Sequence, residues 1–391
     1  MLVGGVALFA AVIGGVRAGL AGCAATGRGP VLTASAIDEA WEAALPRADG
    51  WNGGDIAHTI DAGGRTVWLF GDSIVGPVEN GRRVGDRSRM VRGAIAWHAT
   101  GAEPPREVRF AAPEPLRGVG SASWIAPAPG LWPEGTWYWL MNDAARVGDR
   151  LLLFATAVGP SGNPDGMWNF RRVGGAILEV ANPGDEPTAW RVTQRRNPRV
   201  GEDPRHGEPA RESENQALAI VRWGDGLVYL FGVRYGADGS KSMIVARSRV
   251  EGVGAPAGWE VFDGRTWGAG PAAVVIRGVA DEFTVHAIRR GGRTMLVQVQ
   301  AEAFLSRRIV ARTSWRPEGP WSASATVYDA PDPGPTAFVY AAKAHPALSR
   351  PGELLVTYAV NGEFGRVFED ARLYRPKFVR VPTRLLPEPP G

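Results

Sequence analysis

Cysteine is almost absent from this chain of 391 residues, in which Cys23 is the only one. A single thiol excludes an intramolecular disulfide. Dense basic segments are missing too, because no basic run is longer than an Arg-Arg pair and no nucleic-acid motif occurs. The net charge of +4 therefore predicts a solvated basic surface and no nucleic-acid partner.

Long apolar runs are scarce: after residues 2–16, no segment approaches the roughly 20 apolar residues of a membrane span. Helical periodicity is nearly absent after residue 46. Residues 34–44, with the sequence ASAIDEAWEAA, are typical of a short helix, which we expect to pack outside the main fold. These absences point away from helical folds.

The apolar run at residues 2–16 is followed by Leu-Ala-Gly-Cys23, which is similar to a bacterial lipoprotein signal. In such signals the chain is cut before the cysteine and a lipid is attached to its thiol. We therefore expect a signal at 1–22, a linker with a short helix at 23–49, and export to the periplasm or cell exterior with a membrane anchor at Cys23. Arg17 interrupts the apolar run and no basic residues precede it, so an ordinary signal or a short anchor helix is the alternative.

The chain is rich in glycine, proline and tryptophan, with 52, 31 and 15 residues, which favours many short strands and turns. A hairpin recurs five times, and each second strand is apolar on both faces: 66–70, 151–155, 227–231, 294–298 and 354–358. Third strands follow at 92–97, 174–179, 242–247, 308–312 and 371–374. Repeats at intervals of roughly 60 to 80 residues predict an all-β fold, a five-bladed β-propeller of short antiparallel sheets at 50–385. Two stacked β-sandwiches are the alternative.

In a propeller the first strand of each blade lines the central channel, so hairpin register places its polar side chains. A turn at 61–64 puts Asp55 opposite Phe70 and Asp72 opposite Gly53, at the end where the chain enters the first strand. The same counting brings further polar residues to this mouth of the channel: Glu214 and Asn215 beside Arg234, Glu282 beside Gln300, and Lys343 and His345 with Asn361 above them. Asp143 falls deeper in the channel, and Trp51 lies near the mouth.

Paired carboxylates across a cleft suit glycoside hydrolysis, because one can activate water while the other protonates the departing oxygen. Asp55 and Glu282 are the strongest candidates, since a carboxylate at the start of an innermost strand is unfavourable to bury without a partner or a purpose. Tryptophans near the mouth could stack on sugar rings. We expect the substrate to be bound by Asp72, Asp143, Asn215, Arg234, Gln300, Lys343, His345, Asn361 and Trp51.

The segment FGDS at 70–73 also permits a different interpretation, a GDS-type esterase with Ser73 as its nucleophile. That enzyme class needs a layered α/β fold with helices after the strands. The sequence lacks those helices, and Asp203-Pro-Arg-His206 fits the required Asp-x-x-His pattern only within a polar loop.

Four segments carry a resemblance to a known family: WNGGDIAHTIDAGGRTVWLFGDSIVG, WYWLMNDAARVGDRLLLFATAV, DEFTVHAIRRGGRTMLVQVQ and YAAKAHPALSRPGELLVTYAVN. Over residues 50 to 380 the chain resembles the bacterial propellers called domain of unknown function 4185. Those proteins resemble the five-bladed furanosidases of glycoside hydrolase family 43. The resemblance implies a monomer that cleaves a furanose-containing, arabinan-like polysaccharide or oligosaccharide.

By that resemblance Asp55 is the general base and Glu282 the general acid, and Glu214 stands in the blade of the third acid, an aspartate in the furanosidases. No cofactor is required. The position of His345 is one where some relatives hold a channel histidine beside calcium or water, which allows a structural calcium in the channel. Because the third acid differs, a noncatalytic propeller that binds carbohydrate or protein is the alternative.

Overall fold

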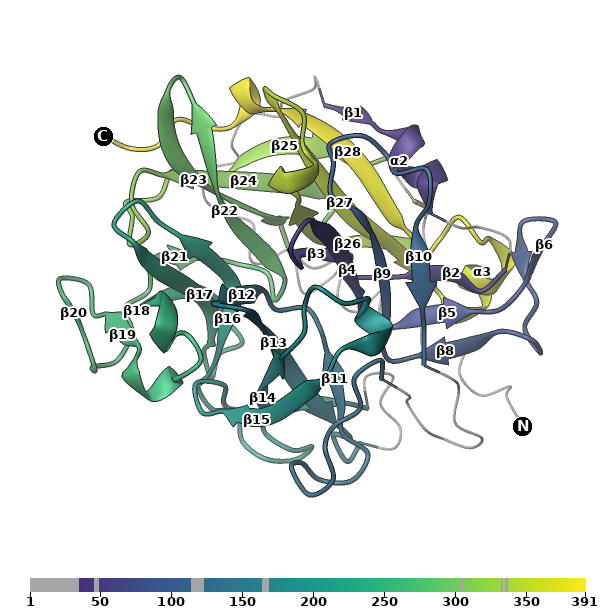
Figure 1. Cartoon of the computed structure of the whole chain (residues 1–391), viewed down its shortest axis with the longest axis horizontal. Coiled ribbons are helices and arrows are strands. Elements are labelled where there is room, and N and C mark those ends of the chain that lie inside the picture. Colours follow the sequence, from purple (N-terminus) through teal and green to yellow (C-terminus); the bar gives the residue numbers. More distant parts are fainter. Residues whose placement is uncertain are drawn as a thin grey trace.

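The computed structural model describes residues 35–45, 49–113, 123–163, 169–303, 306–331, 333–334 and 337–391 (Figure 1). Strands make up most of the described chain, with two short α-helices, α2 (Glu39–Ala44) and α3 (Phe364–Glu369). The prediction of an all-β fold is confirmed. No helix in these ranges has the length and apolar character needed to cross a bilayer. Cys23 and the predicted signal lie outside the described residues.

Five antiparallel sheets of four or more strands account for most of the structure. The first contains β3 (His58–Asp61), β4 (Arg65–Phe70), β9 (Ala94–Ala99) and β10 (Arg109–Ala111). The second contains β11 (Trp137–Trp139), β12 (Ala144–Val147), β13 (Arg150–Gly159), β14 (Arg171–Val180) and β15 (Val192–Asn197). The third contains β16 (Ser213–Arg222), β17 (Leu227–Tyr235), β18 (Lys241–Arg249), β19 (Glu260–Phe262), β20 (Trp267–Gly268) and β21 (Ile276–Arg277).

The fourth sheet contains β22 (Phe283–Arg290), β23 (Arg293–Ala301), β24 (Arg308–Ser314) and β25 (Ala325–Asp329). The fifth contains β26 (Ala337–Ala344), β27 (Glu353–Gly362), β28 (Pro376–Pro382) and β1 (Ala36–Ile37). Two smaller sheets join β2 (Trp51–Gly54) to β5 (Ser73–Val75) and β8 (Arg89–Val91), and β6 (Val78–Glu79) to β7 (Arg82–Arg83). Short 3₁₀ turns span Pro187–Ala189, Val250–Gly252, Pro256–Gly258, Pro346–Leu348 and Thr383–Leu385.

The strands β3, β12, β16, β22 and β26, one from each sheet, lie near the middle of the molecule (Figure 1), and contacts link each of these inner segments to the next. His58 Nε2 of β3 lies 3.2 Å from Asp143 Oδ1, and the other oxygen of Asp143 accepts a hydrogen bond from the Ile220 N–H of β16 at 2.8 Å. Strand β16 contacts β22, and Thr284 Oγ1 of β22 accepts a hydrogen bond from Ala344 N of β26 at 3.0 Å. His345 Nδ1, just after β26, returns to Thr59 Oγ1 of β3 at 2.7 Å.

The first hairpin has a register two residues away from the predicted one. Gly63 and Gly64 form the turn with φ values of 81° and 86°, as a two-residue turn with both central residues at positive φ requires. Ile60 therefore pairs with Val67 rather than Arg65. A shift of two keeps every side chain on its expected face. It also places Asp55 opposite Asp72, whose carbonyl accepts the Asp55 N–H at 3.3 Å.

Residues 36–45 belong to the main fold, which corrects the prediction of a helix outside it. Strand β1 pairs with β28 and extends the fifth sheet. In α2 the side chain of Trp41 is 0% exposed and stacks on Phe378 at a centroid distance of 5.7 Å. Asp38 caps the helix and its other oxygen pairs with Arg380 at 2.6 Å. The folded unit therefore starts before residue 49, inside the segment assigned to a linker.

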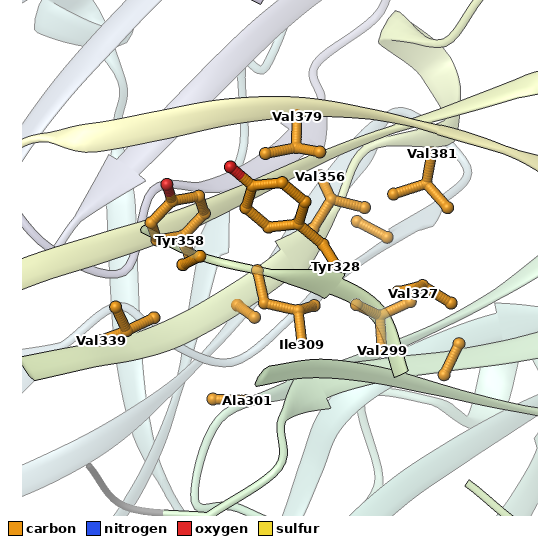
Figure 2. Close-up of a cluster of buried hydrophobic side chains, with 14 of the residues drawn as sticks. Val299, Ala301, Ile309, Val327, Tyr328, Val339, Val356, Tyr358, Val379 and Val381 are labelled. Carbon is orange, nitrogen blue, oxygen red and sulfur yellow. The ribbon is translucent and has the colours of Figure 1, made fainter. Parts of the chain in front are cut away.

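The apolar middle strands are covered on both faces because neighbouring sheets pack against each other. Figure 2 shows side chains of the fourth sheet, including Val299, Ile309 and Val327, against Val356 and Val379 of the fifth. This packing explains why the second strand of each hairpin lacks a polar face.

Candidate active site

Asp55 lies between β2 and β3, where the chain makes a strained bend. Ile56 and Ala57 have φ values of 66° and 48°, and the Ala57 N–H donates to the Asp55 carbonyl at 2.7 Å. Gly71 faces the bend, and a Cβ atom there would lie 2.2 Å from Asp55 Oδ1. The glycine of the Gly-Asp-Ser segment is therefore needed to make room for the Asp55 carboxyl group.

The two oxygens of Asp55 have different surroundings. Oδ2 accepts hydrogen bonds from the hydroxyls of Tyr340 at 2.7 Å and Tyr374 at 3.2 Å. Oδ1 is buried and has no hydrogen-bond partner among the described residues. Burial, followed by the charges of Asp72 and Glu282, raises the pKa of Asp55 well above its usual value, while the two tyrosine hydroxyls lower it.

Asp72 lies opposite Asp55 in the first hairpin and forms an ion pair with Arg92. Arg92 donates to Asp72 Oδ2 at 2.6 Å, and its guanidinium lies 4.7 Å from the centre of the Trp137 ring. Burial raises the pKa of Asp72, and Arg92 partly offsets that rise. Asp72 is thus a charged neighbour of Asp55 that already has its own partner.

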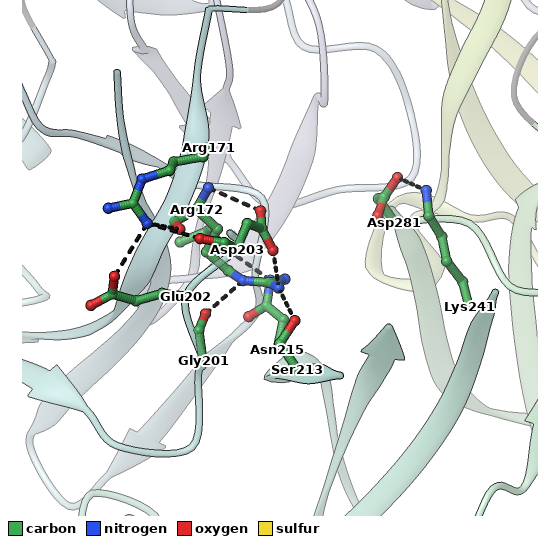
Figure 3. Close-up of polar contacts among 10 residues, drawn as sticks. Arg171, Arg172, Gly201, Glu202, Asp203, Ser213, Asn215, Lys241 and Asp281 are labelled. Carbon is green, nitrogen blue, oxygen red and sulfur yellow. Dashed lines mark hydrogen bonds and ion pairs between the residues drawn. The ribbon is translucent and has the colours of Figure 1, made fainter. Parts of the chain in front are cut away.

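Glu282 directly precedes β22 and also has a buried oxygen, Oε2, with no hydrogen-bond partner in the described part of the chain. Burial raises the pKa of Glu282 to about 7, and the positive charge of Lys343 opposes the rise. Lys343 is 0% exposed, and its Nζ donates to the Met141 carbonyl at 3.3 Å. Burial lowers the pKa of this lysine. The side chain of Asp281 turns instead to Lys241, with which it forms an ion pair (Figure 3).

Asp55 and Glu282 interact electrostatically, because the charge of Glu282 contributes to the raised pKa of Asp55. Two interacting carboxyl groups that are both removed from water disfavour the state in which both are ionised. Such a pair favours the states in which one member carries a proton. One group is then able to accept a proton while the other is able to donate one.

Glu214 pairs with Arg234 across β16 and β17, as the hairpin count predicts. Arg234 donates to Glu214 Oε1 through Nε at 3.1 Å and Nη2 at 2.7 Å. In this ion pair two arginine nitrogens reach one carboxylate oxygen, whereas no ion pair to Asp55 or Glu282 occurs among the described residues. The catalytic role of Glu214 stays a prediction. Next to it, Asn215 is buried and donates to Thr156 Oγ1 of the second sheet at 3.0 Å.

The polar groups below the acidic pair hold the inner strands together. Asp143 contacts His58 and the backbone of β16. Burial raises the pKa of Asp143, but the hydrogen bond and the charge of His58 outweigh burial, so this pKa lies below its usual value. His345 has Thr59 and Thr357 hydroxyls at 2.7 and 2.8 Å from its two ring nitrogens. Both nitrogens are thus engaged within the fold. Among the described residues no group of three or more His, Cys, Asp or Glu side chains is arranged to hold a metal ion, and a channel calcium stays a prediction.

The remaining predicted binding residues are distributed between the site and the core. Gln300 is buried and accepts a hydrogen bond from Gln298 Nε2 at 2.7 Å. Asn361 lies closer to the pair, because its Nδ2 donates to the Tyr340 hydroxyl at 3.5 Å. Trp51 is a correction: it is 3% exposed and packs between Phe70 and Phe110 at 4.6 and 4.8 Å, so its ring is not available to a sugar.

Ser73 does not have the surroundings of a catalytic nucleophile. The side chain is 0% exposed, and its Oγ donates to the Gly71 carbonyl at 3.1 Å and accepts from Trp51 Nε1 at 3.3 Å. No histidine is among these partners, and the distant Asp203 forms an ion pair with Arg172. The all-β fold and this geometry are both incompatible with the GDS-esterase interpretation.

Ion pairs attach the loop at 198–212 to the second sheet (Figure 3). Arg172 at the start of β14 donates to the Gly201 carbonyl at 2.7 Å, pairs with Asp203, and stacks 4.2 Å from the Tyr235 ring centre. Burial, then the charge of Asp281, raises the pKa of Tyr235 well above its usual value. The loop is therefore connected, through Arg172 and Tyr235, to Asp281, the residue before Glu282.

Sequence reasoning missed three partners of the two acids in the first hairpin: Tyr340 and Tyr374, which donate to Asp55, and Arg92, which donates to Asp72. Tyr340 lies in the predicted first strand of the fifth hairpin, but a bulge between Tyr340 and Lys343 changes which residues share a face. Tyr374 lies in a bend before β28 rather than in a third strand at 371–374. The polar character of these positions was a usable signal, whereas the bulge and the bend carry no clear sequence pattern.

The fold and the site define an all-β protein with two coupled acids at the entry to its inner strands. The chain belongs to the family described as Domain of unknown function (DUF5005), whose pattern matches residues 38–383. The predicted membership in family 4185 is not confirmed. No curated protein matched the chain.

Solved structures support the fold. A protein from Bacteroides ovatus ATCC 8483, provisionally assigned as a hydrolase, matches with a TM-score of 0.67 and 20% identity over 88% of this chain and 89% of its own. An exo-1,5-alpha-L-arabinanase from a bovine ruminal metagenomic library gives 0.43 and 10% identity over 85% and 93%. A thermostable family-43 glycoside hydrolase gives 0.41 and 11% identity over 85% and 90%. The first match shows a shared fold, and the other two are too distant to add to it.

Proposed function

We propose that this protein is a five-bladed β-propeller that hydrolyses glycosidic bonds in a furanose-containing, arabinan-like polysaccharide. The five larger sheets would be the blades, which is supported by the contacts that link each inner segment to the next. The acidic pair then lies where β3 and β22 begin, at one mouth of the channel. Sugar polymers would reach the pair from that mouth.

The observation that carries the proposal is the pairing of Asp55 with Glu282. Each carboxyl group has one buried oxygen without a partner among the described residues, and their charges interact. Glycoside hydrolysis needs one ionised and one protonated carboxyl group flanking the scissile bond. A pair in which one member is protonated and the other ionised provides both forms.

The hydrogen bonds support a different role for each acid. Asp55 receives two hydroxyl donors, which favour its ionised form, whereas Glu282 has no donor on its buried oxygen and a pKa of about 7. Glu282 therefore holds the proton and transfers it to the departing glycosidic oxygen as the carbon–oxygen bond breaks. Asp55 takes a proton from the water that attacks the anomeric carbon, and exchange with solvent restores both groups.

Release of reducing ends from a furanose polymer tests the proposal. Purified protein incubated with arabinan should produce new reducing ends, and the product should be absent with Asp55→Asn. Binding of the polymer without any new reducing ends, unchanged in Asp55→Asn and Glu282→Gln, would instead identify a noncatalytic carbohydrate-binding propeller.

We also propose that the protein is exported and anchored through a lipid on Cys23, because the apolar segment and Leu-Ala-Gly-Cys23 precede a fold that starts near residue 36. In a bacterial host that processes lipoproteins, Cys23→Ser should move the protein from the membrane to the soluble fraction and end incorporation of labelled palmitate. Thr26→Ser is the matched control and should remain anchored. Wild-type protein without label would contradict the anchor.

A further inference from the structure

Backbone strain is concentrated around Asp55. Six non-glycine residues of the described chain have positive φ values: Ile56, Ala57, Asn80, Ala217, Ala341 and Tyr374. Four of them are the two residues after Asp55, the neighbour of Tyr340, and Tyr374 itself. Left-handed conformations are unfavourable for residues with a Cβ atom, and they persist where the surrounding structure enforces them. This clustering indicates that the positions of Asp55 and the two tyrosines are held at a cost in stability.

The two tyrosine hydroxyls reach the same carboxylate oxygen from separate elements. Tyr340 belongs to β26 and Tyr374 to the bend before β28, yet both donate to Asp55 Oδ2, at 2.7 and 3.2 Å. A phenol has one hydrogen to donate. Because Asn361 Nδ2 donates to the Tyr340 oxygen at 3.5 Å, the Tyr340 hydrogen is directed to Asp55. Oδ1 remains the oxygen of Asp55 without a described donor.

A buried arginine joins the segment that carries Tyr374 to the strand that leads to Asp55. Arg83 is 4% exposed and donates to the carbonyls of Leu373 at 2.9 Å and Asn52 at 3.0 Å, as well as to that of Val367. The Gly54 N–H donates to the Tyr374 carbonyl at 2.7 Å. These bonds fix the bend beside β2, so the Tyr374 hydroxyl meets the carboxyl group that follows β2.

We propose that Tyr340 and Tyr374 are positioning residues that hold Asp55 ionised through Oδ2 and leave Oδ1 as the proton acceptor for water. The assignment of Oδ1 to water rests on the proposed hydrolase function, whereas the ionisation of Asp55 does not. Hydroxyl donors to a carboxylate stabilise its charged form. Two of them on one oxygen also fix the plane of the carboxyl group.

The largest influences on the ionisation of Asp55 work in the opposite direction to the tyrosines. Burial and the negative charges of Asp72 and Glu282 favour its protonated form, and the two tyrosines are the groups that counter them. Arg92 is already paired with Asp72, and Arg83 donates to amide and carbonyl oxygens. Removing either hydroxyl should therefore make Asp55 harder to ionise. The acidic limb of kcat/KM should move to higher pH by about one unit, with activity below that limb reduced about tenfold.

A titration of Asp55 measured by NMR with ¹³C-labelled aspartate tests this without relying on activity. Asp55→Asn identifies the Asp55 signal, and Tyr340→Phe and Tyr374→Phe are each compared with wild type. Tyr358→Phe is the matched control, because Tyr358 is buried in the same sheet and lies beside Tyr328 instead of Asp55 (Figure 2). We expect a higher Asp55 pKa in both tyrosine variants and no change in the control.

An unchanged Asp55 pKa in both variants would overturn the proposal, as would an equal change in Tyr358→Phe. Each variant removes only one oxygen atom. If just one of the two folds, the Asp55 pKa in that variant alone decides the result. A raised Asp55 pKa in a protein that releases no reducing ends would reject the hydrolase function and leave the role of the tyrosines intact. If the wild-type protein releases reducing ends but the Asp55 pKa is unchanged in both tyrosine variants, the role of the tyrosines is rejected and the hydrolase function is left intact.

Discussion

Asp55→Asn should lower kcat/KM on a furanose polymer about 10²- to 10⁴-fold and, at neutral pH, raise the free energy of unfolding. The rate falls because an amide cannot accept the proton of the attacking water. Stability rises because burial, Asp72 and Glu282 raise the pKa of Asp55 in the folded state. A group with a raised folded pKa contributes stability at low pH that is lost as the pH increases through that pKa. Asparagine does not ionise and avoids that loss.

Kinetics combined with denaturation across pH would measure both effects. Asp61→Asn is the matched control, because Asp61 is an exposed acid in the same hairpin whose Oδ1 accepts the N–H groups of Gly63 and Gly64. An asparagine at 61 can accept the same bonds, so its activity and stability should stay close to those of the wild type. A variant at 55 that is inactive and also less stable would indicate a structural role for Asp55.

The strands were predictable because sheets packed on both faces require apolar side chains throughout. Segments such as 66–70 and 227–231 therefore stand out as strands without an alignment, and a polar residue that begins the preceding strand then becomes conspicuous. This reasoning finds Asp55 and Glu282, because a buried acid is rare enough to require an explanation. This reasoning does not depend on the exact register, because the shift of two residues in the first hairpin leaves Asp55 and Asp72 at the same end of it.

The surroundings of Trp51 and Tyr340 could not be predicted from the sequence. A tryptophan four residues before Asp55 is expected to share its site, but the register of β2 shifts between Trp51 and Gly53, and Trp51 enters the core. In β26 the bulge at Ala341, with φ at 53°, interrupts the alternation of faces between Tyr340 and Lys343. Both deviations arise from local irregularities in strand pairing, which composition and periodicity do not reveal.

The activity that Glu282→Gln loses should depend on the leaving group of the substrate, and this dependence distinguishes the general acid from the general base. On the polymer we expect kcat/KM to fall about 10²- to 10⁴-fold, because the departing sugar oxygen must be protonated. On an aryl furanoside with an acidic phenol the loss should be small, since that phenolate leaves without a proton. Asp55→Asn should be slow on both substrates, because water activation is needed in each case.

The pH profile supplies the second signature of Glu282. Its protonated form is the active one, so wild-type kcat/KM should decline as the pH rises through about 7, which is its pKa in the folded protein. Glutamine cannot ionise, and the alkaline limb should disappear from the residual activity of Glu282→Gln. Glu260→Gln, at an exposed glutamate paired with Arg247 at 2.7 Å, should keep the wild-type profile. If Glu282→Gln kept the alkaline limb, or were equally slow on both substrates, Glu282 would not be the general acid.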